Sequence, residues 1–406
     1  MNARETERLT CVACGQVHDI AQVPSTCSAC GGILDLDIPG PEQNAIPHAD
    51  EDTRSLWHWA QWLPDCARED RVSLGEAGTP LLPCPRLAAD SQLESLWIKN
   101  DSIMPTGSFK DRAIALAVSL ARTYGRPGLV LSSSGNAGAS AAAYAARAGM
   151  PVVVLVPATA PAAKLRQIAV TGAQLVTVDG ATSDCCRLAD ELARSRGWVN
   201  LTTTFHNPYG VDAYATLAYE VAQAAPDVLL LPISSGPLLV GIMKGFARLQ
   251  AAGLASKMPR PVAVQPTRCA PITTAWTSGT PVTSTTPGKT IASALSDTLE
   301  GYADHGAYTL SWLRRYDGAC LAVDEDEIAH AVQRTARCEG IVLEPSAAAP
   351  IAAAPRLGEV LGITPSTRVM AVVTGHGLKD LSIVETEDLG TPIPPDFSAL
   401  THRIGT

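Results

Sequence analysis

The chain has 406 residues, of which 46% are hydrophobic and 17% charged, and it carries a formal net charge of -9. This length exceeds what one ordinary core supports, so we expect two main domains and a small additional module. The acidic balance argues against a general nucleic-acid or membrane-surface binder. No stretch approaches the roughly 18 apolar residues of a membrane span, and the polar start lacks a signal-peptide core, so we expect a cytoplasmic protein.

The first forty residues contain two C-x-x-C pairs, Cys11 with Cys14 and Cys27 with Cys30, separated by twelve residues. A glycine follows each pair, as a metal knuckle requires. Four thiolates at this spacing are typical of a structural tetrahedral zinc site. A redox pair or unpaired thiols is the alternative. The 11 cysteines are an odd number at scattered positions, which does not indicate a disulfide framework.

A connector with proline and acidic residues follows from 39 to about 52. After it come Trp57, Trp59 and Trp62, which we expect to pack as one face of a helix. Further along, residues 277–290 are rich in Ser, Thr, Pro and Gly, and this composition predicts a mobile loop.

From about residue 94, short β-branched runs alternate with alanine-rich runs. We expect strands at 96–99, 129–132, 152–156, 175–178, 228–233, 262–265 and 369–373. We expect helices at 114–122, 139–147, 162–170, 186–196, 213–225 and 328–337. The alternation predicts an α/β fold of open parallel sheets covered on both faces. In such a sheet ligands bind beyond the carboxyl ends of the strands, so the strand-to-helix turns are the candidate site.

The first informative turn reads NDSIMPTGSFKDR, residues 100–112, and leads into an alanine-rich helix. Pro105 and Gly107 favour a turn, Ser108 is a candidate helix cap, and Lys110 falls in the first helical turn. The helix dipole disfavours a cation there, typically by about 0.3–1 kcal/mol, and so favours the neutral amine. A neutral amine condenses with carbonyl compounds. A solvated lysine at a helix start is the alternative.

Two further turns are suited to anions. SSSGNAG at 132–138 offers hydroxyls and the backbone N–H groups of a helix start to a carboxylate, and Asn136 adds an amide; an ordinary capped turn is the alternative. SSGPLLVG at 234–241 has small residues that let the backbone approach a phosphate. It lacks both common nucleotide-loop spacings, which argues against ATP and NAD. The last strand ends in TGHGLKD at 374–380, whose threonine hydroxyl is suited to meet a heteroaromatic nitrogen.

Together these segments resemble the threonine synthase branch of the fold-type II, tryptophan synthase β-like, pyridoxal-phosphate enzymes. The similarity covers LGEAGTPLLPCPRL at 74–87, PTGSFKDR at 105–112, SSSGNAGASAAAYAARAG at 132–149, EGIVLEPSAAA at 339–349 and VVTGHGLKD at 372–380. Members of this family often carry an N-terminal zinc ribbon, which agrees with the cysteine pairs.

The resemblance implies that Lys110 holds the cofactor as a Schiff base and acts as general acid and base. It places Phe109 beside the cofactor, Asn136 on its phenolic oxygen and Thr374 opposite the pyridine nitrogen. It assigns the phosphate cup to Ser234, Ser235, Gly236, Leu238 and Leu239. It assigns the substrate carboxylate to Ser133, Ser134, Gly135, Asn136 and Ala137.

The resemblance also implies three parts. These are a zinc ribbon at 1–40, a large cofactor-binding domain at 41–112 and 216–406, and a small mobile α/β domain at 113–215. Because family members are commonly dimers, we expect a homodimer that acts on a small amino acid.

The family reaction converts O-phosphohomoserine and water to threonine and phosphate. In it the lysine amine removes the α-proton of an amino-acid aldimine, and a β or γ leaving group is eliminated or replaced. A neutral hydroxyl at the ring nitrogen leaves a weaker electron sink, which favours this chemistry over transamination. The alternatives are β-elimination or β-replacement on another amino acid in a specialised pathway, as in dehydratases and cysteate synthase, and a non-catalytic relative.

The sequence departs from the family where a substrate phosphate would bind. Phosphohomoserine enzymes usually carry basic residues shortly after an Asn-Pro-Tyr, but here Gly210 and Ala215 occupy those positions, and Ser296 stands where an arginine is expected. The SSGPL phosphate cup also differs from the family's glycine-rich forms. Each charge-assisted partner of a phosphate is worth roughly 1.5–3 kcal/mol. We therefore expect a leaving group other than phosphate.

Overall fold

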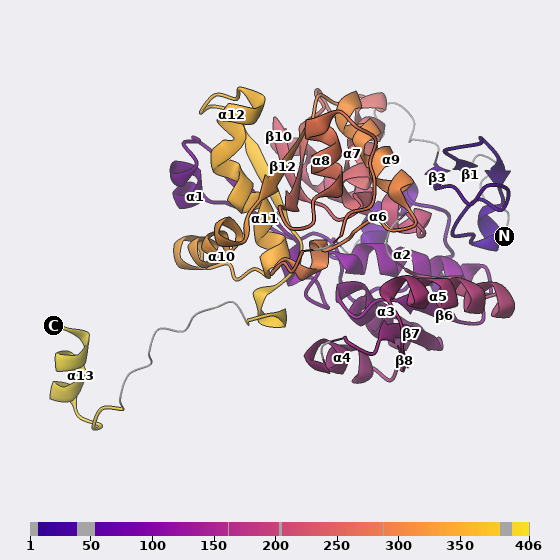
Figure 1. Ribbon diagram of the computed structural model, residues 1–406, viewed down its shortest axis with the longest axis horizontal. Coiled ribbons are helices and arrows are strands. Elements are labelled where there is room, and N and C mark those ends of the chain that lie inside the picture. Colours follow the sequence, from indigo (N-terminus) through magenta and orange to yellow (C-terminus); the bar gives the residue numbers. More distant parts are fainter. Residues whose placement is uncertain are drawn as a thin grey trace.

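The computed structural model describes residues 7–38, 53–160, 162–202, 205–286, 288–381 and 392–405. The connector expected at 39–52 lies outside these residues. The described chain forms one small antiparallel sheet and two larger sheets, with helices packed around the larger ones (Figure 1). Among the described residues, no helix combines the length and apolar character needed to cross a membrane.

The N-terminal module is a three-stranded antiparallel sheet in the order β2-β1-β3. Its strands are β1 (Arg8–Cys11), β2 (Val17–His18) and β3 (Leu34–Asp37). Along β3, Leu34 and Leu36 are buried, whereas Asp35 is half-buried and Asp37 is exposed on the other face, as the two-residue period of a strand dictates. The module therefore presents one apolar face to the rest of the protein.

The largest sheet has six strands in the order β12-β11-β10-β13-β5-β4. They are β4 (Leu81–Pro83), β5 (Leu96–Asn100), β10 (Val228–Pro232), β11 (Arg260–Pro266), β12 (Ala319–Val323) and β13 (Val369–Val373). All neighbours are parallel except β4, which runs antiparallel at the edge. The strands β10 and β13 are wholly buried, because helices cover both faces of a parallel sheet.

The second sheet is parallel throughout, in the order β8-β7-β6-β9. Its strands are β6 (Leu129–Ser132), β7 (Val152–Pro157), β8 (Gln174–Val178) and β9 (Val199–Asn200), and its helices are α3 (Asn136–Ala148), α4 (Ala162–Ala169) and α5 (Thr182–Arg196).

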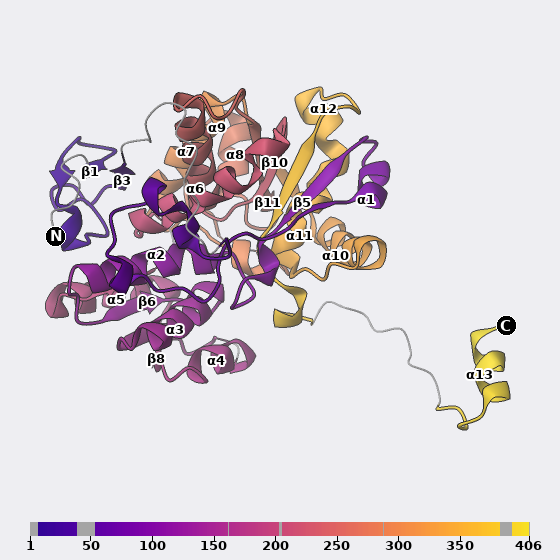
Figure 2. The ribbon, with the colours of Figure 1, turned by 180° about the vertical axis from the view of Figure 1, so that it is seen from behind.

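The remaining helices belong to the large sheet or follow it. They are α1 (Pro85–Asp90), α2 (Lys110–Thr123), α6 (Pro208–Val221), α7 (Pro237–Ala251), α8 (Pro271–Ser278), α9 (Ala303–Arg315), α10 (Glu325–Glu339), α11 (Pro345–Ala353), α12 (Leu357–Leu361) and α13 (Phe397–Ile404). Helix α2 packs against both α3 and α6. It lies between the two sheet layers in both views (Figures 1 and 2).

Every strand and helix expected from the alternating pattern is present; the strands at 129–132 and 369–373 have the expected ends, and the other elements have shifted ends. Helices begin up to five residues earlier than expected, as at Pro208 for the helix expected from 213. Their first turns carry proline and polar residues, which the apolar pattern does not mark. The tryptophan patch does pack, with Trp57 and Trp62 buried, but as a 3-10 helix over Leu56–Trp62 that is irregular at Trp59.

A buried ion-pair network fixes the start of α2. Arg112, which has no exposed surface, pairs with Asp101 at 2.8 Å and with Glu220 at 2.5 Å. Lys99 on β5 joins from the other side, 2.5 Å from Glu220. Burial raises the pKa of Glu220, but Arg112 and Lys99 outweigh burial and lower it to about 2. The carboxylate is therefore ionised, and β5, α2 and α6 are held together.

Replacing Arg112 with alanine should lower the free energy of unfolding by about 3–5 kcal/mol, because it leaves buried carboxylates without a counter-charge. Urea denaturation followed by circular dichroism measures this loss. The matched control is Arg187→Ala, which removes an exposed pair with Glu191 on α5 and should leave the unfolding curve close to that of the wild type. Equal curves for the two variants would contradict the assigned role of Arg112.

Candidate active site

Three of the expected ligand loops leave adjacent strands of the large sheet. Strands β5, β13 and β10 are parallel neighbours, so the loops that follow them emerge at the same edge. The amide of Phe109 donates to the carbonyl of Thr374 at 3.0 Å, and the amide of His376 donates to the carbonyl of Gly107 at 3.0 Å. The lysine turn and the TGHG turn are thus joined by main-chain hydrogen bonds.

Lys110 is the first residue of α2, and its side chain is half-buried. Its Nζ lies 4.7 Å from the centroid of the Phe109 ring, which stacks on Tyr214 at 5.1 Å. Burial lowers the pKa of Lys110 to about 8, although the nearby carboxylates of Asp297 and Glu344 oppose that change. The amine is therefore far easier to deprotonate than an ordinary lysine.

Ser108 does not cap α2, which corrects the expectation from sequence. Its hydroxyl is buried and makes no hydrogen bond to any described residue. The turn is held by Asp111 instead, whose carboxylate accepts from the Thr106 amide at 2.8 Å and the Thr106 hydroxyl at 2.6 Å. Asp111 also accepts from the Ser140 hydroxyl on α3 at 2.6 Å, so it links the lysine turn to the second sheet.

The SSSGN turn connects β6 to α3 and approaches the site from the second sheet. Ser133, Ser134 and Gly135 are half-buried, and the Ser133 hydroxyl accepts from the Gly135 amide at 3.2 Å. Within the described chain, no side chain caps the helix that follows. The side chain of Ala137 is a buried methyl group, so this residue can offer a ligand only its backbone. The turn therefore presents mainly N–H groups, as a carboxylate requires.

Glu344 ties this turn to the large sheet. Its carboxylate accepts from Nδ2 of Asn136 at 2.8 Å, and its amide donates to the carbonyl of Gly375 at 3.1 Å. Our sequence reasoning missed this residue. The signal was present, because a glutamate directly before Pro345 at a helix start lies within the EGIVLEPSAAA segment.

The SSGP loop connects β10 to α7. The carbonyl of Ser235 accepts from the Thr309 hydroxyl on α9 at 2.6 Å, whereas the Ser235 hydroxyl is buried and makes no hydrogen bond to the described residues. Gly236 has φ +105, and a Cβ there would collide with the side chain of Thr309. Only glycine fits this close approach. Leu238 and Leu239 point into the core, so each offers only its backbone.

Asp297 is a second residue that sequence reasoning missed, next to Ser296. Its carboxylate accepts from the Tyr302 hydroxyl at 2.7 Å and from the Leu299 amide at 3.1 Å. Together with Glu344, it gives the surroundings of the Lys110 amine a negative charge.

The four cysteines of the N-terminal module converge, as the spacing predicts. Their sulfurs all lie within 4.8 Å of one another, with Cys11 and Cys30 at 3.5 Å and Cys14 and Cys27 at 3.7 Å. All 11 cysteines of the chain lie in described residues, and none forms a disulfide there.

Comparison with known proteins places this chain in a family. Residues 72–375 match the family described as "Pyridoxal-phosphate dependent enzyme". The chain is 31% identical to threonine synthase of Methanosarcina acetivorans over 98% of both chains, and 31% identical to threonine synthase of Methanocaldococcus jannaschii over 91% of this chain and 92% of that one. The solved structure of processed threonine deaminase isoform 2 from Solanum lycopersicum shares the fold, with a TM-score of 0.65 at 21% identity over 87% of this chain and 99% of that one. The chain therefore belongs to the pyridoxal-phosphate dependent enzymes of fold type II, and within that family it is a threonine synthase-like lyase.

Proposed function

We propose that Lys110 holds pyridoxal phosphate covalently and moves the α-proton of an amino-acid substrate. The observation that carries this proposal is the half-buried Lys110 amine with its lowered pKa. The turn that carries it is joined to the Thr374 turn by main-chain hydrogen bonds. A lysine with these properties is the nucleophile that carbonyl condensation needs.

The residues of the SSGP loop fit the cofactor's phosphate. The Ser235 hydroxyl is buried and makes no hydrogen bond within the described chain, and no described side chain caps α7. We propose that the hydroxyls of Ser234 and Ser235 and the backbone of Gly236, Leu238 and Leu239 hold the phosphate at the positive end of the α7 dipole. Gly236 is required there because of its contact with Thr309.

The other turns fit the ring and the substrate. We propose that Phe109 packs beside the ring, that Thr374 faces its nitrogen and that Asn136 binds its phenolic oxygen. For the substrate carboxylate we propose the turn formed by Ser133, Ser134, Gly135, Asn136 and Ala137. Glu344 holds the Asn136 amide at 2.8 Å, and this contact orients the amide toward the large sheet.

The chemistry divides between the cofactor and the chain. When bound, pyridoxal phosphate supplies an electron sink for the negative charge that develops at the substrate's α-carbon. Lys110 takes the α-proton at Nζ and can return it, because a pKa of about 8 suits both steps near neutral pH. The SSSGN turn fixes the substrate by its carboxylate, so the α-proton stays within reach of one amine.

Attachment of the cofactor to the apoenzyme should become faster as pH rises, with a midpoint near pH 8. Only the neutral amine attacks the aldehyde, and the neutral fraction increases as pH passes through the pKa of about 8. Stopped-flow absorbance after mixing with pyridoxal phosphate measures the rate. Lys110→Ala should show no slow spectral change, whereas the exposed Lys289→Ala should behave as the wild type. A midpoint near that of a free lysine would contradict the assignment.

We also propose that the substrate's leaving group is not a phosphate. Two of the three positions that lack the family's basic residues are buried: Ala215 has no exposed surface, and a Cβ on Gly210 would lie 2.9 Å from that of Ala113. Neither position has room for a basic side chain. The carboxylate of Asp297 near Lys110 would in addition repel a dianion. These features favour β-elimination or β-replacement of a neutral group.

O-Phosphohomoserine should react at least about 100-fold less efficiently than the best non-phosphorylated substrate, because two missing partners at about 1.5 kcal/mol each amount to about 3 kcal/mol. The kcat/KM values of a panel of phosphorylated, acetylated and free hydroxy amino acids measure this difference in efficiency. Asp297→Asn should improve the reaction with phosphohomoserine, and the exposed Asp304→Asn should not. Efficient phosphate release by the wild type would rule out the proposal.

We propose that Cys11, Cys14, Cys27 and Cys30 bind one structural zinc ion. A tetrahedral site with Zn–S bonds of about 2.3 Å places its sulfurs about 3.8 Å apart. The sulfur–sulfur distances are close to this value, at 3.5 Å between Cys11 and Cys30 and 3.7 Å between Cys14 and Cys27. His18 Nε2 lies 3.3 Å from the Cys27 sulfur and can donate to a thiolate there, a contact that orients metal ligands.

Purified protein should contain one zinc per chain, measured by inductively coupled plasma mass spectrometry. Cys14→Ser should lose most of the metal and lower the melting temperature, because metal binding to such a module contributes directly to its folding. Cys338→Ser, half-buried on α10, is the control and should retain the metal. A zinc-free wild type with an ordered N-terminal sheet would refute the site.

A further inference from the structure

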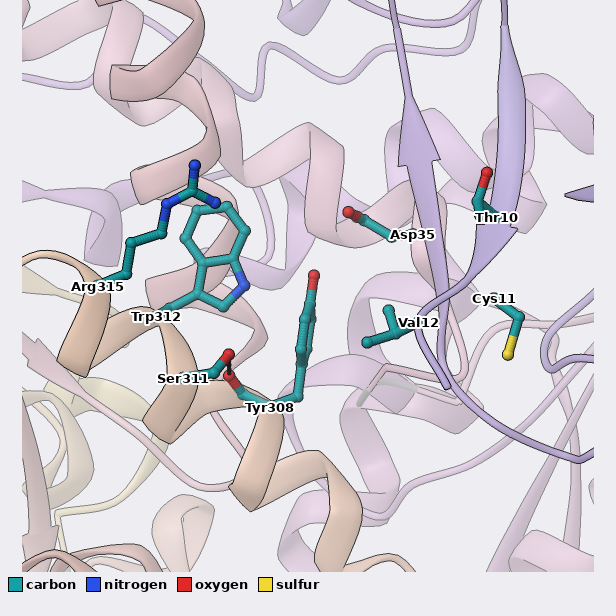
Figure 3. Close-up of a pocket in the computed structure, with 8 residues that line it drawn as sticks. All are labelled: Thr10, Cys11, Val12, Asp35, Tyr308, Ser311, Trp312 and Arg315. Atoms are coloured by element: carbon teal, nitrogen blue, oxygen red, sulfur yellow. Dashed lines mark hydrogen bonds between the residues drawn. The ribbon is translucent and has the colours of Figure 1, made fainter. Parts of the chain in front are cut away.

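A cavity separates the N-terminal module from α9. It has a volume of about 340 Å³, which is within the range of small-molecule sites. Residues 308, 311, 312 and 315 form one face of α9 and line one wall (Figure 3), since residues three and four apart share a helix face. The opposite wall comes from Thr10 and Cys11 on β1, from Val12 in the turn after it, and from Asp35 on β3. The cavity shares no lining residue with the site around Lys110.

One side of the cavity carries a cation that lacks a counter-charge. The Arg315 guanidinium stacks on the Trp312 ring at 5.6 Å and the Tyr316 ring at 5.4 Å. Throughout the described ranges, no carboxylate forms an ion pair with it. Because the two rings already restrict the Arg315 guanidinium, this side chain loses less conformational entropy when a ligand binds. The planar N–H donors of the guanidinium match the two oxygens of a carboxylate.

The other side of the cavity carries a carboxylate that can accept more hydrogen bonds. One oxygen of Asp35 accepts from Lys244 on α7 at 2.5 Å. Lys244 also donates to Asp212 at 3.0 Å and to the carbonyl of Leu36 at 2.8 Å, so its three protons are divided among three acceptors. An ionised carboxylate has about four acceptor positions. In Figure 3 the Tyr308 side chain points toward Asp35, between the two charged residues.

We propose that this cavity binds a free α-amino acid. The carboxylate pairs with Arg315, the ammonium group donates to Asp35 and Thr10, and an apolar side chain packs against Val12 and Trp312. The cavity thus offers a cation, an anion and an apolar surface, which are the complements of the three parts of a neutral amino acid.

The same helix connects the cavity to the proposed phosphate cup. Thr309 follows Tyr308 on α9, and its hydroxyl donates to the carbonyl of Ser235 at 2.6 Å. Lys244 lies on α7, which begins directly after Gly236. An amino acid bound between α9 and Asp35 would therefore contact α9 directly and α7 through the Asp35–Lys244 pair. Any resulting change in cofactor affinity rests on the proposed function, whereas the binding of the amino acid to this cavity does not.

The test is isothermal titration calorimetry of the holoenzyme with the protein L-amino acids, one at a time. The enzyme is first reduced with sodium borohydride, which fixes the cofactor on Lys110 and prevents exchange with an added amine. At least one neutral amino acid should bind with one-to-one stoichiometry. Arg315→Gln should weaken binding at least tenfold, and the analogue without the amino group should bind at least tenfold more weakly.

Arg314→Gln is the matched control, because Arg314 is an exposed neighbour on α9 outside the cavity lining; it should bind as the wild type does. Absence of binding by every amino acid, or equal binding by Arg315→Gln, would overturn the proposal. Cofactor retention after reduction is read separately by absorbance. Loss of that signal with intact amino-acid binding would count against the proposed function alone.

Discussion

The position of Lys110 depends on the buried charge of Arg112. Three successive residues at the start of α2 point in different directions, and two of them are tied to other elements. Arg112 is held by Asp101 and Glu220 in the large-sheet layer, and Asp111 by Thr106 and Ser140 toward the second sheet. A helix turns by about 100° per residue, so fixing these two side chains fixes the direction left for Lys110. Breaking the network would cost several kcal/mol, which makes the lysine turn one of the most constrained parts of the chain.

The site lies where the two sheets meet, and its hydrogen bonds cross that boundary. Main-chain bonds join the loops of β5 and β13 within the large sheet, and Asn136 reaches Glu344 from the second sheet. Burial and acidic neighbours act in opposite directions on Lys110, and burial has the larger effect on its pKa. The same acids that moderate the amine would also repel a second phosphate, which is the basis of the proposal on the leaving group. In that proposal, charge links the reactivity of Lys110 to the class of substrate.

The N-terminal module is bound to the large sheet by charge as well as by its apolar face. Lys244 on α7 contacts both Asp35 of β3 and Asp212 of α6, and Arg248 also pairs with Asp212. Helices α7 and α9 both reach the loop at 234–236. The module and that loop are thus connected through two helices, and the cavity beside α9 lies along this connection.

The sequence by itself determined the α/β class, the main strands and helices, the four-cysteine cluster and the turns of the candidate site, because these depend on short-range periodicity and local turn chemistry. It also identified the family through PTGSFKDR and TGHGLKD. It did not reveal the partners that come from distant segments: Glu344 beside Asn136, Asp297 near Lys110, Thr309 against Gly236 and Arg315 opposite Asp35. Even the cap of α2 was misassigned, because the expected Ser108 hydroxyl faces the interior and Asp111 closes the turn instead. Only the tertiary structure decided these contacts, since they depend on strand order and helix packing, and neither leaves a periodic mark in the chain.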